Sequence, residues 1–247
     1  MIQYSDWKKK YSDILMEFNY KEEKDNESAK ILNSILESSN IIEKISKLIK
    51  NKTVFVIGSG PSLSRSISKL KNYKNSVKIA ADSSLKPLVE NGVVPDIIVT
   101  DLDGDRDTLE KITRTQSSIF VVHAHADNKT KLELAKNFKK CIGTTQAKPF
   151  GKIKNFGGFT DGDRGVFLAS HFCAKKIILF GMDFGERIGK FSNTKRSERK
   201  IKLMKLKKGE FLLEWLSTFT RSELFTTSRP IKGFKKITYR ELDITIT

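Results

Sequence analysis

Apolar and polar residues follow two different periods along the chain, and the change between them comes near residue 50. Between residues 27 and 50, isoleucine and leucine recur at helical spacing and form one apolar stripe that contains neither Gly nor Pro. We therefore expect residues 5–50 to be helical. Their apolar face must pack on the main domain or on a second copy of the chain, so a homodimer is one expected arrangement.

From Thr53 onward, short runs rich in β-branched residues alternate with turns and amphipathic stretches. The runs predict strands at residues 54–57, 77–81, 97–100, 119–123, 141–143 and 177–180. The stretches between them predict helices at about 62–71, 84–91, 107–115, 128–138 and 163–173. Apolar strands that alternate with helices are typical of an α/β, Rossmann-like fold, in which a mostly parallel sheet has helices on both faces.

The last quarter of the chain extends this pattern. Residues 144–160 read as a loop, residues 196–219 predict a helix, and the alternating tail at 235–247 predicts an edge strand. We expect an N-terminal helical segment at 1–50, an α/β domain at 51–185, and a basic helix with a C-terminal strand at 186–247 that pack on the same domain.

Charge is the strongest feature of the composition. The 247 residues include 46 Lys and Arg against 29 Asp and Glu, a formal net charge of +17. Ten residues of the segment 187–208 are basic, while Glu198 is its single acidic residue. This excess predicts a polyanionic partner, which composition alone leaves open among nucleic acid, a membrane surface and phosphate-rich small molecules.

Other bulk features exclude several classes. No apolar stretch approaches the roughly 18–20 residues of a membrane span, and the N-terminal residues lack the apolar core of a signal peptide. We therefore expect no membrane partner. Cys141 and Cys173 make neither a disulfide framework nor a zinc cluster, so we expect the protein to be cytoplasmic.

The residues that directly follow each strand carry the candidate chemistry, because ligands of parallel α/β sheets bind beyond the carboxyl ends of the strands. After the first strand comes the turn Gly58, Ser59, Gly60, Pro61 and Ser62. Its glycines allow a tight turn, and free N–H groups at the start of the next helix favour an anion such as phosphate. The turn is neither a Walker A loop nor a complete dinucleotide fingerprint, so an ordinary strand–helix connection is an equal alternative.

Acidic residues follow the second and third strands. Asp82 is placed to accept hydrogen bonds from a ribose, or simply to cap the next helix. Asp101 and Asp103 are two residues apart, and in an extended segment they face the same side. Two such carboxylates repel each other, so a cation between them is favoured, and oxygen ligands beside a phosphate favour Mg²⁺. A solvated acidic turn is the alternative.

Two more segments add polar side chains. The fourth strand runs into His123, His125, Asp127 and Asn128. A His-x-His pair can hold a transition metal, but the remaining histidine lies within a predicted helix, which argues against a three-histidine zinc site.

The segment 158–164 leads into another helix. Thr160 or Asp161 can cap this helix. Arg164 is unfavourable at a helix N-terminus unless an anion or neighbouring aspartates offset its charge.

Four segments in this order, IGSGPSL, VPDIIVTDLDGD, HAHADN and GFTDGDRG, resemble the archaeal 6-hydroxymethyl-7,8-dihydropterin pyrophosphokinase family. That family is related in fold to the thiamine pyrophosphokinase catalytic domain, and the resemblance covers about residues 50–185. It implies a nucleotide-binding catalytic domain that transfers a diphosphoryl group from ATP to the hydroxymethyl oxygen of a reduced pterin, with Mg²⁺ as cofactor and AMP as the second product. Such a transfer needs positioning and charge neutralisation more than a protein nucleophile.

The resemblance also implies roles for the residues at the strand ends. Asp101 and Asp103 are expected to hold Mg²⁺, and Asp127 or His123 is expected to orient the hydroxymethyl group or take its proton. The nucleotide is expected to contact Gly58, Ser59, Gly60, Pro61, Ser62 and Asp82. The pterin is expected to contact Asn128, Thr160, Asp161, Gly162 and Arg164.

Two other functions stay open. Related domains occur in bacterial flagellin-modifying proteins, and the DLD segment resembles the Asp-x-Asp metal sites of sugar transferases, so a nucleotide-sugar-binding, glycosyltransferase-like protein is the alternative. A nucleic-acid binder would suit the charge, but the chain has no zinc-finger signature and no interleaved basic–aromatic platform, so nucleic acid is not an expected partner.

The basic segment also yields a hypothesis. Lys195, Arg196, Arg199 and Lys202 are candidates to fold toward the triphosphate of ATP, with a solvated helix face as the alternative.

Overall fold

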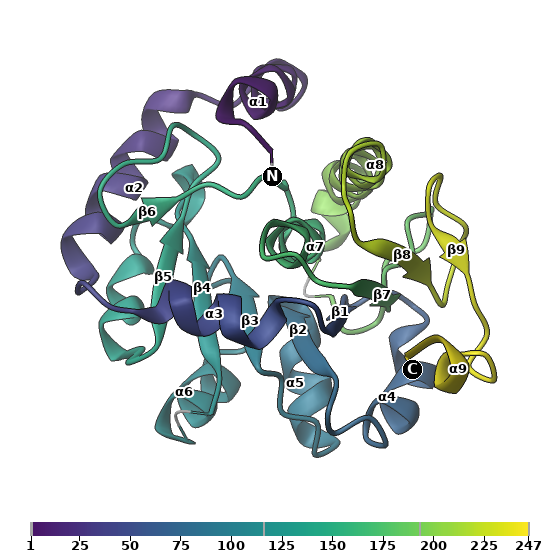
Figure 1. Cartoon of the computed structure of the whole chain (residues 1–247). Coiled ribbons are helices and arrows are strands. Elements are labelled where there is room, and N and C mark those ends of the chain that lie inside the picture. Colours follow the sequence, from purple (N-terminus) through teal and green to yellow (C-terminus); the bar gives the residue numbers. More distant parts are fainter. Residues whose placement is uncertain (1, 116, 193, 247) are drawn as a thin grey trace.

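The computed structural model describes residues 2–115, 117–192 and 194–246, and the sheet at its centre is parallel throughout these ranges (Figure 1). Its strands are β1 (Thr53–Ile57), β2 (Val77–Ala81), β3 (Ile97–Thr100), β4 (Ile119–His123), β5 (Cys141–Thr144), β6 (Ile153–Lys154), β7 (Lys176–Phe180), β8 (Glu223–Thr226) and β9 (Lys235–Lys236). Each of the six strands predicted between residues 54 and 180 is present, with its ends shifted by no more than one residue. The fold is therefore α/β and Rossmann-like, as predicted.

The strand order is β6-β5-β4-β3-β2-β1-β7-β8-β9, so the chain reverses its direction of travel across the sheet at β1. It first builds outward from β1 to β6, then returns to place β7 on the other side of β1. The loops after β1 and β7 therefore diverge from a common point. In open α/β sheets, a crevice at such a point is where ligands bind.

Helices cover both faces of the sheet. They are α1 (Tyr4–Phe18), α2 (Glu22–Ile35), α3 (Ile41–Ile49), α4 (Leu63–Leu70), α5 (Asp82–Glu90), α6 (Arg106–Thr115), α7 (Asp161–His171), α8 (Arg199–Ser217) and α9 (Leu242–Ile246). Figure 1 shows α4, α5 and α6 below the sheet and α7 and α8 above it, with α1 beyond them. Within the described ranges, every helix is too short or too polar to cross a bilayer.

Buried side chains explain this layering. Alternate residues along each strand point to opposite faces, so Val54 and Val56 pack with α3 and α7, while Phe55 and Ile57 pack with α4. Both faces of the central strands are buried, as expected for strands that are apolar along their whole length.

Several predicted elements differ from the structure. The apolar stripe at 27–50 is divided between α2 and α3, and the predicted helix at 128–138 is replaced by two 3₁₀ segments, η1 (Ala126–Asn128) and η2 (Leu132–Asn137). The predicted loop at 144–160 contains β6. The tail contributes β9 at the sheet edge but then turns into α9, and its final residue, Thr247, lies outside the described residues.

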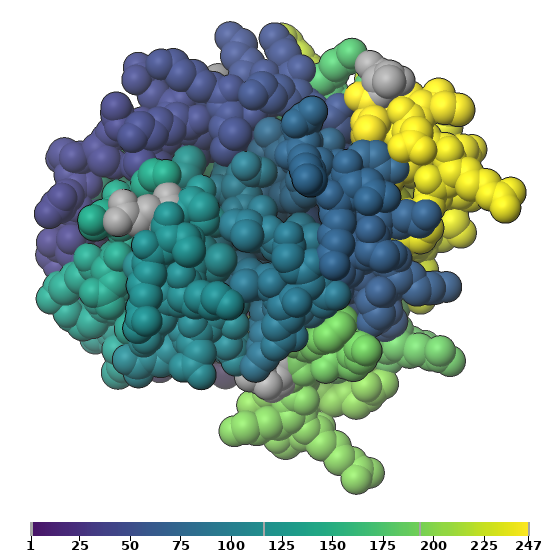
Figure 2. Space-filling view, turned by 90° about the horizontal axis from the view of Figure 1, so that it is seen from below, coloured from purple at the N-terminus to yellow at the C-terminus, as the bar shows by residue number. Residues whose placement is uncertain are grey.

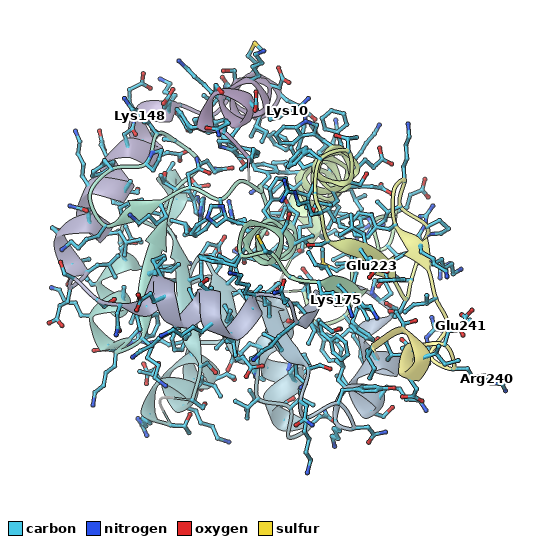
Figure 3. All side chains as sticks on the ribbon, viewed as in Figure 1. Lys10, Lys148, Lys175, Glu223, Arg240 and Glu241 are labelled. Atoms are coloured by element: carbon cyan, nitrogen blue, oxygen red, sulfur yellow. The ribbon has the colours of Figure 1, made fainter. Side chains whose placement is uncertain are left out.

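The N-terminal helices are tied to the rest of the molecule by specific polar contacts. The indole Nε1 of Trp7 donates to the backbone oxygen of Gln146 at 2.7 Å. The Nζ atom of Lys10, labelled at the top of Figure 3, lies 4.9 Å from the ring centroid of Phe211 on α8. The helical layer therefore packs on the same molecule through both its apolar stripe and its polar edge.

Candidate active site

Three carboxylates meet at the carboxyl edge of the sheet. Asp82 follows β2, Asp101 follows β3, and Asp161 is the first residue of α7. Each offers an oxygen atom, and these atoms all lie within 4.8 Å of one another. β2 and β3 are parallel neighbours, so their ends coincide, and the α7 N-terminus brings the third carboxylate to the same place.

Asp82 is the most deeply buried member of this acidic cluster. Its Oδ2 atom accepts hydrogen bonds from Oγ1 of Thr100 at 2.6 Å and from the N–H of Gly104 at 3.0 Å. Its Oδ1 atom is buried and has no hydrogen-bond partner among the described residues. Burial raises the pKa of Asp82 to about 7. A buried, unpartnered carboxylate oxygen indicates a place for a ligand, because buried polar atoms are otherwise paired.

The pKa values of Asp101 and Asp161 are shifted in opposite directions. Burial acts to raise the pKa of Asp101, but contact with His125 and the charges of His125 and Arg164 outweigh it and lower the pKa to about 2. Burial, followed by the negative charge of Asp101, raises the pKa of Asp161 well above its usual value. Nη1 of Arg164 lies 3.1 Å from Oδ1 of Asp161, so a neighbouring aspartate offsets the arginine at the helix N-terminus.

The acidic cluster fits a hard divalent cation. All of its donor atoms are carboxylate oxygens, which Mg²⁺ prefers over nitrogen or sulfur ligands. Neighbouring carboxylates cannot all be ionised without a compensating charge, and a cation supplies it. The cluster is therefore a candidate metal centre.

Asp103 lies apart from this cluster. Leu102 adopts a left-handed conformation with φ of 66°, so the segment is not extended and the alternation expected for Asp101 and Asp103 does not hold. The Asp103 side chain is 55% exposed and forms an ion pair with Lys131. The structure thus pairs Asp101 with Asp82 and Asp161 instead of with Asp103.

The two histidines after β4 occupy different positions. His123 is buried, with Nδ1 3.1 Å from Oγ1 of Thr144, and burial lowers its pKa well below the usual value. His125 lies closer to the acidic cluster, with Nε2 3.4 Å from Oδ2 of Asp101. Asp127 is exposed. Of these residues, His125 is therefore the one in contact with a carboxylate of the cluster, although the sequence favoured His123 or Asp127.

Asn128 connects the loops that carry these groups. Its Nδ2 atom donates to the backbone oxygens of Asp101 at 2.8 Å and His123 at 2.6 Å. Its Oδ1 atom accepts the N–H of His125 at 3.0 Å. Both donor bonds and one acceptor bond of the amide go to backbone groups of the protein. Asn128 therefore holds the loops after β3 and β4 in position.

The start of α7 is fixed by its own cap. The N–H of Thr160 donates to Oδ1 of Asp163 at 2.8 Å, and the N–H of Phe159 donates to Oδ2 at 2.6 Å. Thr160 is the N-cap, as the sequence suggested. At Gly162, a Cβ atom would lie 2.7 Å from the sulfur of Met182, so this glycine permits close packing of α7 on the β7 loop.

The glycine turn after β1 uses its backbone donors internally. The N–H of Gly58 donates to Phe180, and that of Gly60 donates to Gly181, at 2.8 and 2.7 Å. The N–H and the hydroxyl of Ser62 both donate to Oδ2 of Asp183 at 2.8 Å. Asp183, which the sequence analysis did not single out, therefore occupies the anion position at the start of α4.

Two adjacent hollows lie beside the turn. The smaller, about 80 Å³, is lined by the predicted residues Gly58, Ser59, Gly60, Asp161 and Gly162, and by others that include Arg187 and Lys202. The larger, about 840 Å³, includes Pro61 and lies between α8 and the loops after β7 and β8. Asp183, Phe184 and Arg187 line both, so the two hollows are neighbours.

The basic residues proposed to face a triphosphate are dispersed. Lys202 lines the smaller hollow, and Nη2 of Arg199 donates to the backbone oxygen of Glu186 at 2.8 Å. Lys195 and Arg196 are exposed and line neither hollow.

A parallel α/β sheet with a cluster of carboxylates at its carboxyl edge defines a Rossmann-like protein with a candidate metal centre. A family model described as "6-hydroxymethylpterin diphosphokinase MptE-like" matches residues 26–189, and the chain belongs to this family. The resemblance seen in the four sequence segments is therefore confirmed.

Similar proteins are found in archaea, each named 6-hydroxymethyl-7,8-dihydropterin pyrophosphokinase. The chain is 41% identical to the protein of Pyrococcus furiosus, over 92% of this chain and 100% of the relative. It is 42% identical to that of Methanocaldococcus jannaschii, over 85% and 94%, and 37% identical to that of Methanothermobacter thermautotrophicus, over 85% and 93%.

The fold is also found in solved structures. Among them is the MAf glycosyltransferase from Magnetospirillum magneticum AMB-1, with a TM-score of 0.50 and 14% identity. The likeness covers 81% of this chain but 38% of the glycosyltransferase. At this identity it shows the fold alone.

Proposed function

We propose that the protein transfers diphosphate from ATP to the hydroxymethyl group of 6-hydroxymethyl-7,8-dihydropterin and releases AMP, in a Mg²⁺-dependent reaction. Membership of the family and the names of the archaeal relatives support this substrate pair. The observation in the structure that carries the proposal is the acidic cluster of Asp82, Asp101 and Asp161 at the carboxyl edge of the sheet.

The reaction breaks a phosphoanhydride bond of ATP and forms a phosphate ester bond on the pterin. The hydroxymethyl oxygen attacks the β-phosphorus of ATP, and the bond between this phosphorus and the oxygen that bridges to the α-phosphorus breaks. The bridging oxygen leaves with AMP, while the β- and γ-phosphates stay together on the pterin. The hydroxyl proton passes to a base, so no covalent intermediate with the protein is needed.

Asp82, Asp101 and Asp161 would hold the Mg²⁺ ion, which would neutralise charge on the phosphate oxygens. The cluster takes over the role that the sequence assigned to Asp101 and Asp103. Hydrogen bonds from Thr100 and Gly104 hold one oxygen of Asp82 and so fix the orientation of its carboxylate.

His125 is the residue that we propose to orient the acceptor hydroxyl. Its side chain is 16% exposed, and its buried Nε2 atom lies 3.4 Å from Oδ2 of Asp101 without a hydrogen bond to any of the described residues. His123 is buried behind it and Asp127 is exposed to solvent, so neither has the same access to the cluster. Asn128 holds the backbone of His125 in place.

The test is product analysis with the purified protein, ATP, the reduced pterin and Mg²⁺. We expect AMP and pterin diphosphate in equal amounts by chromatography, and ³¹P NMR should show the diphosphate transferred intact. A chelator should stop the reaction. Absence of AMP in metal-replete buffer, or formation of ADP instead, would refute the proposal. CMP- and UDP-sugars offered in parallel test the glycosyltransferase alternative, which predicts that they bind in preference to ATP.

A further inference from the structure

The larger hollow, of about 840 Å³, takes no part in the chemistry described above. It is bounded by α8, by the loop that follows β7 and by Arg229 in the loop after β8. Its size falls within the range typical of pockets for cofactors and other small ligands. Figure 2 shows green atoms, from the segment after β7, projecting from the surface on the side away from the yellow C-terminal segment and the purple N-terminal helices.

Positive charge gathers around this hollow. Arg187, Lys200, Lys207 and Arg229 line it, and none of the four forms an ion pair among the residues that the structure describes. The carboxylates in the lining are Asp183, Glu186 and Glu210.

One of these carboxylates offsets the cations only weakly. Asp183 is already engaged by two hydrogen bonds from Ser62. Burial and the charge of Glu214 raise the pKa of Glu210, while the charge of Arg229 acts to lower it. The hollow therefore has cations to offer to an anionic ligand.

The lining also has an apolar part. Phe184, Leu203 and Met204 contribute it, beside the basic side chains. A pocket with apolar side chains and unpaired cations suits a ligand with a flat ring and a phosphate group. A nucleotide has both, whereas an uncharged pterin would leave the cations without a partner.

The smaller hollow lies between the larger one and the acidic cluster. It shares Asp183, Phe184 and Arg187 with the larger hollow and reaches Asp161, with Lys202 on its wall. Charge along the carboxyl edge thus changes from negative at β2 and β3 to positive beyond β7. A ligand that lies along this edge could place phosphates near Asp161 and its base beside α8.

We propose that the larger hollow binds the nucleoside monophosphate half of ATP, the part that leaves as AMP. The cations that line the hollow then stabilise the leaving group on the side of the metal centre opposite His125. This inference rests on the proposed function for the identity of its ligand. The pterin would then bind on the other side of the acidic cluster, next to β4.

The experiment measures AMP binding by titration calorimetry at low ionic strength, with the full-length protein. The test variant is the double substitution Lys200→Glu and Lys207→Glu. The control is Lys44→Glu and Lys47→Glu, which changes the net charge equally on exposed lysines of α3, at the opposite edge of the sheet. Met204→Trp, which fills the hollow without changing charge, is the second test variant. Thermal unfolding shows that each variant is folded.

We expect both test variants to weaken AMP binding at least about tenfold, or about 1.4 kcal/mol, and the control to bind as the unchanged protein does. Equal AMP affinity in all variants would overturn the inference. It would also be overturned if the test variants weakened binding of the pterin and left AMP binding unchanged. Turnover separates this outcome from failure of the proposed function. If the unchanged protein makes AMP while the test variants keep its KM for ATP, the pocket inference alone fails. If it makes no AMP, the proposed function fails, whatever the binding data show.

Discussion

Removal of the Asp25 carboxylate should destabilise the protein through the loss of one buried and one partly buried hydrogen bond. Asp25, on α2, is buried between α1 and the loop after β4. Its Oδ2 atom accepts the hydroxyl of Tyr11 at 2.7 Å, and its Oδ1 atom accepts the N–H of Ala126 at 3.0 Å. Asp25→Ala leaves both donors without this acceptor, the Tyr11 hydroxyl at a buried position and the N–H of Ala126 at a partly buried one.

The size of the effect follows from these two donors. Each buried donor left unpaired costs about 1–3 kcal/mol. Part of the loss is offset because a buried carboxylate, whose pKa burial raises, no longer has to be desolvated. We expect a net loss of about 2–3 kcal/mol, which for a chain of this size lowers Tm by roughly 4–12 °C.

Asp25→Asn separates hydrogen bonding from charge. The amide oxygen can still accept the N–H of Ala126, and the amide nitrogen can donate to the Tyr11 hydroxyl, so we expect Tm to stay near that of the unchanged protein. Asp13→Ala, at an exposed position of α1, is the control and should change stability by less than about 0.5 kcal/mol. Calorimetric or fluorescence melts measure all three. A Tm in Asp25→Ala equal to that of the control would refute the reasoning, and so would an equal loss in Asp25→Asn.

Other predictions follow from single contacts. In the metal-free protein the folded-state pKa of Asp82, about 7, exceeds its unfolded value of 3.8, so the folded state retains a proton that the unfolded chain releases; the free energy of unfolding should therefore fall as pH rises from 4 to 7, and Mg²⁺ should raise Tm more at pH 7.5 than at pH 5. A flat pH profile would contradict this. Asn128→Ala removes three hydrogen bonds and should lower both Tm and kcat. Thermal melts and AMP assays measure the two effects, and a wild-type kcat would show that these hydrogen bonds are not needed to position the site. Gly60→Ala places a Cβ atom 2.7 Å from the Gly181 oxygen and should cost about 1–3 kcal/mol in denaturant titrations, whereas Lys131→Ala breaks an exposed ion pair and should cost less than about 1 kcal/mol.

Much of the fold could be predicted because the strands are apolar along their whole length and are separated by turn residues. The segment 128–138 was harder, since its apolar residues keep helical spacing while the chain folds into 3₁₀ turns. The division of 27–50 into two helices depends on residues 36–40, where neither Gly nor Pro marks a break. The local pattern in both places permits more than one backbone path, and tertiary packing selects one.

The site was predictable in place and less so in detail. The rule that ligands bind beyond the carboxyl ends of parallel strands identified Asp82 and Asp101. Asp161 was predicted as a helix cap or a pterin contact, and not as a partner of these two carboxylates. The rule could not show that Leu102 adopts a left-handed conformation, which separates Asp103 from Asp101. The sequence also could not show which of the two histidines contacts the acidic cluster, because this depends on which one is buried at the end of β4. Asp183 follows β7 by the same rule and could have been found by applying it once more.

The central claim is that Asp82, Asp101 and Asp161 hold the divalent ion needed for diphosphoryl transfer. The most direct measurement is AMP formation as a function of Mg²⁺ concentration, for the unchanged protein and for Asp101→Asn, Asp161→Asn and Asp103→Asn. Asp107→Asn, at an exposed position of α6, is the control for loss of one negative charge. We predict that Asp101→Asn and Asp161→Asn each lower kcat at least about a hundredfold and weaken activation by Mg²⁺, while Asp103→Asn has a much smaller effect. Wild-type activation by Mg²⁺ in Asp161→Asn, together with a loss in Asp103→Asn as large as that in Asp101→Asn, would contradict the account.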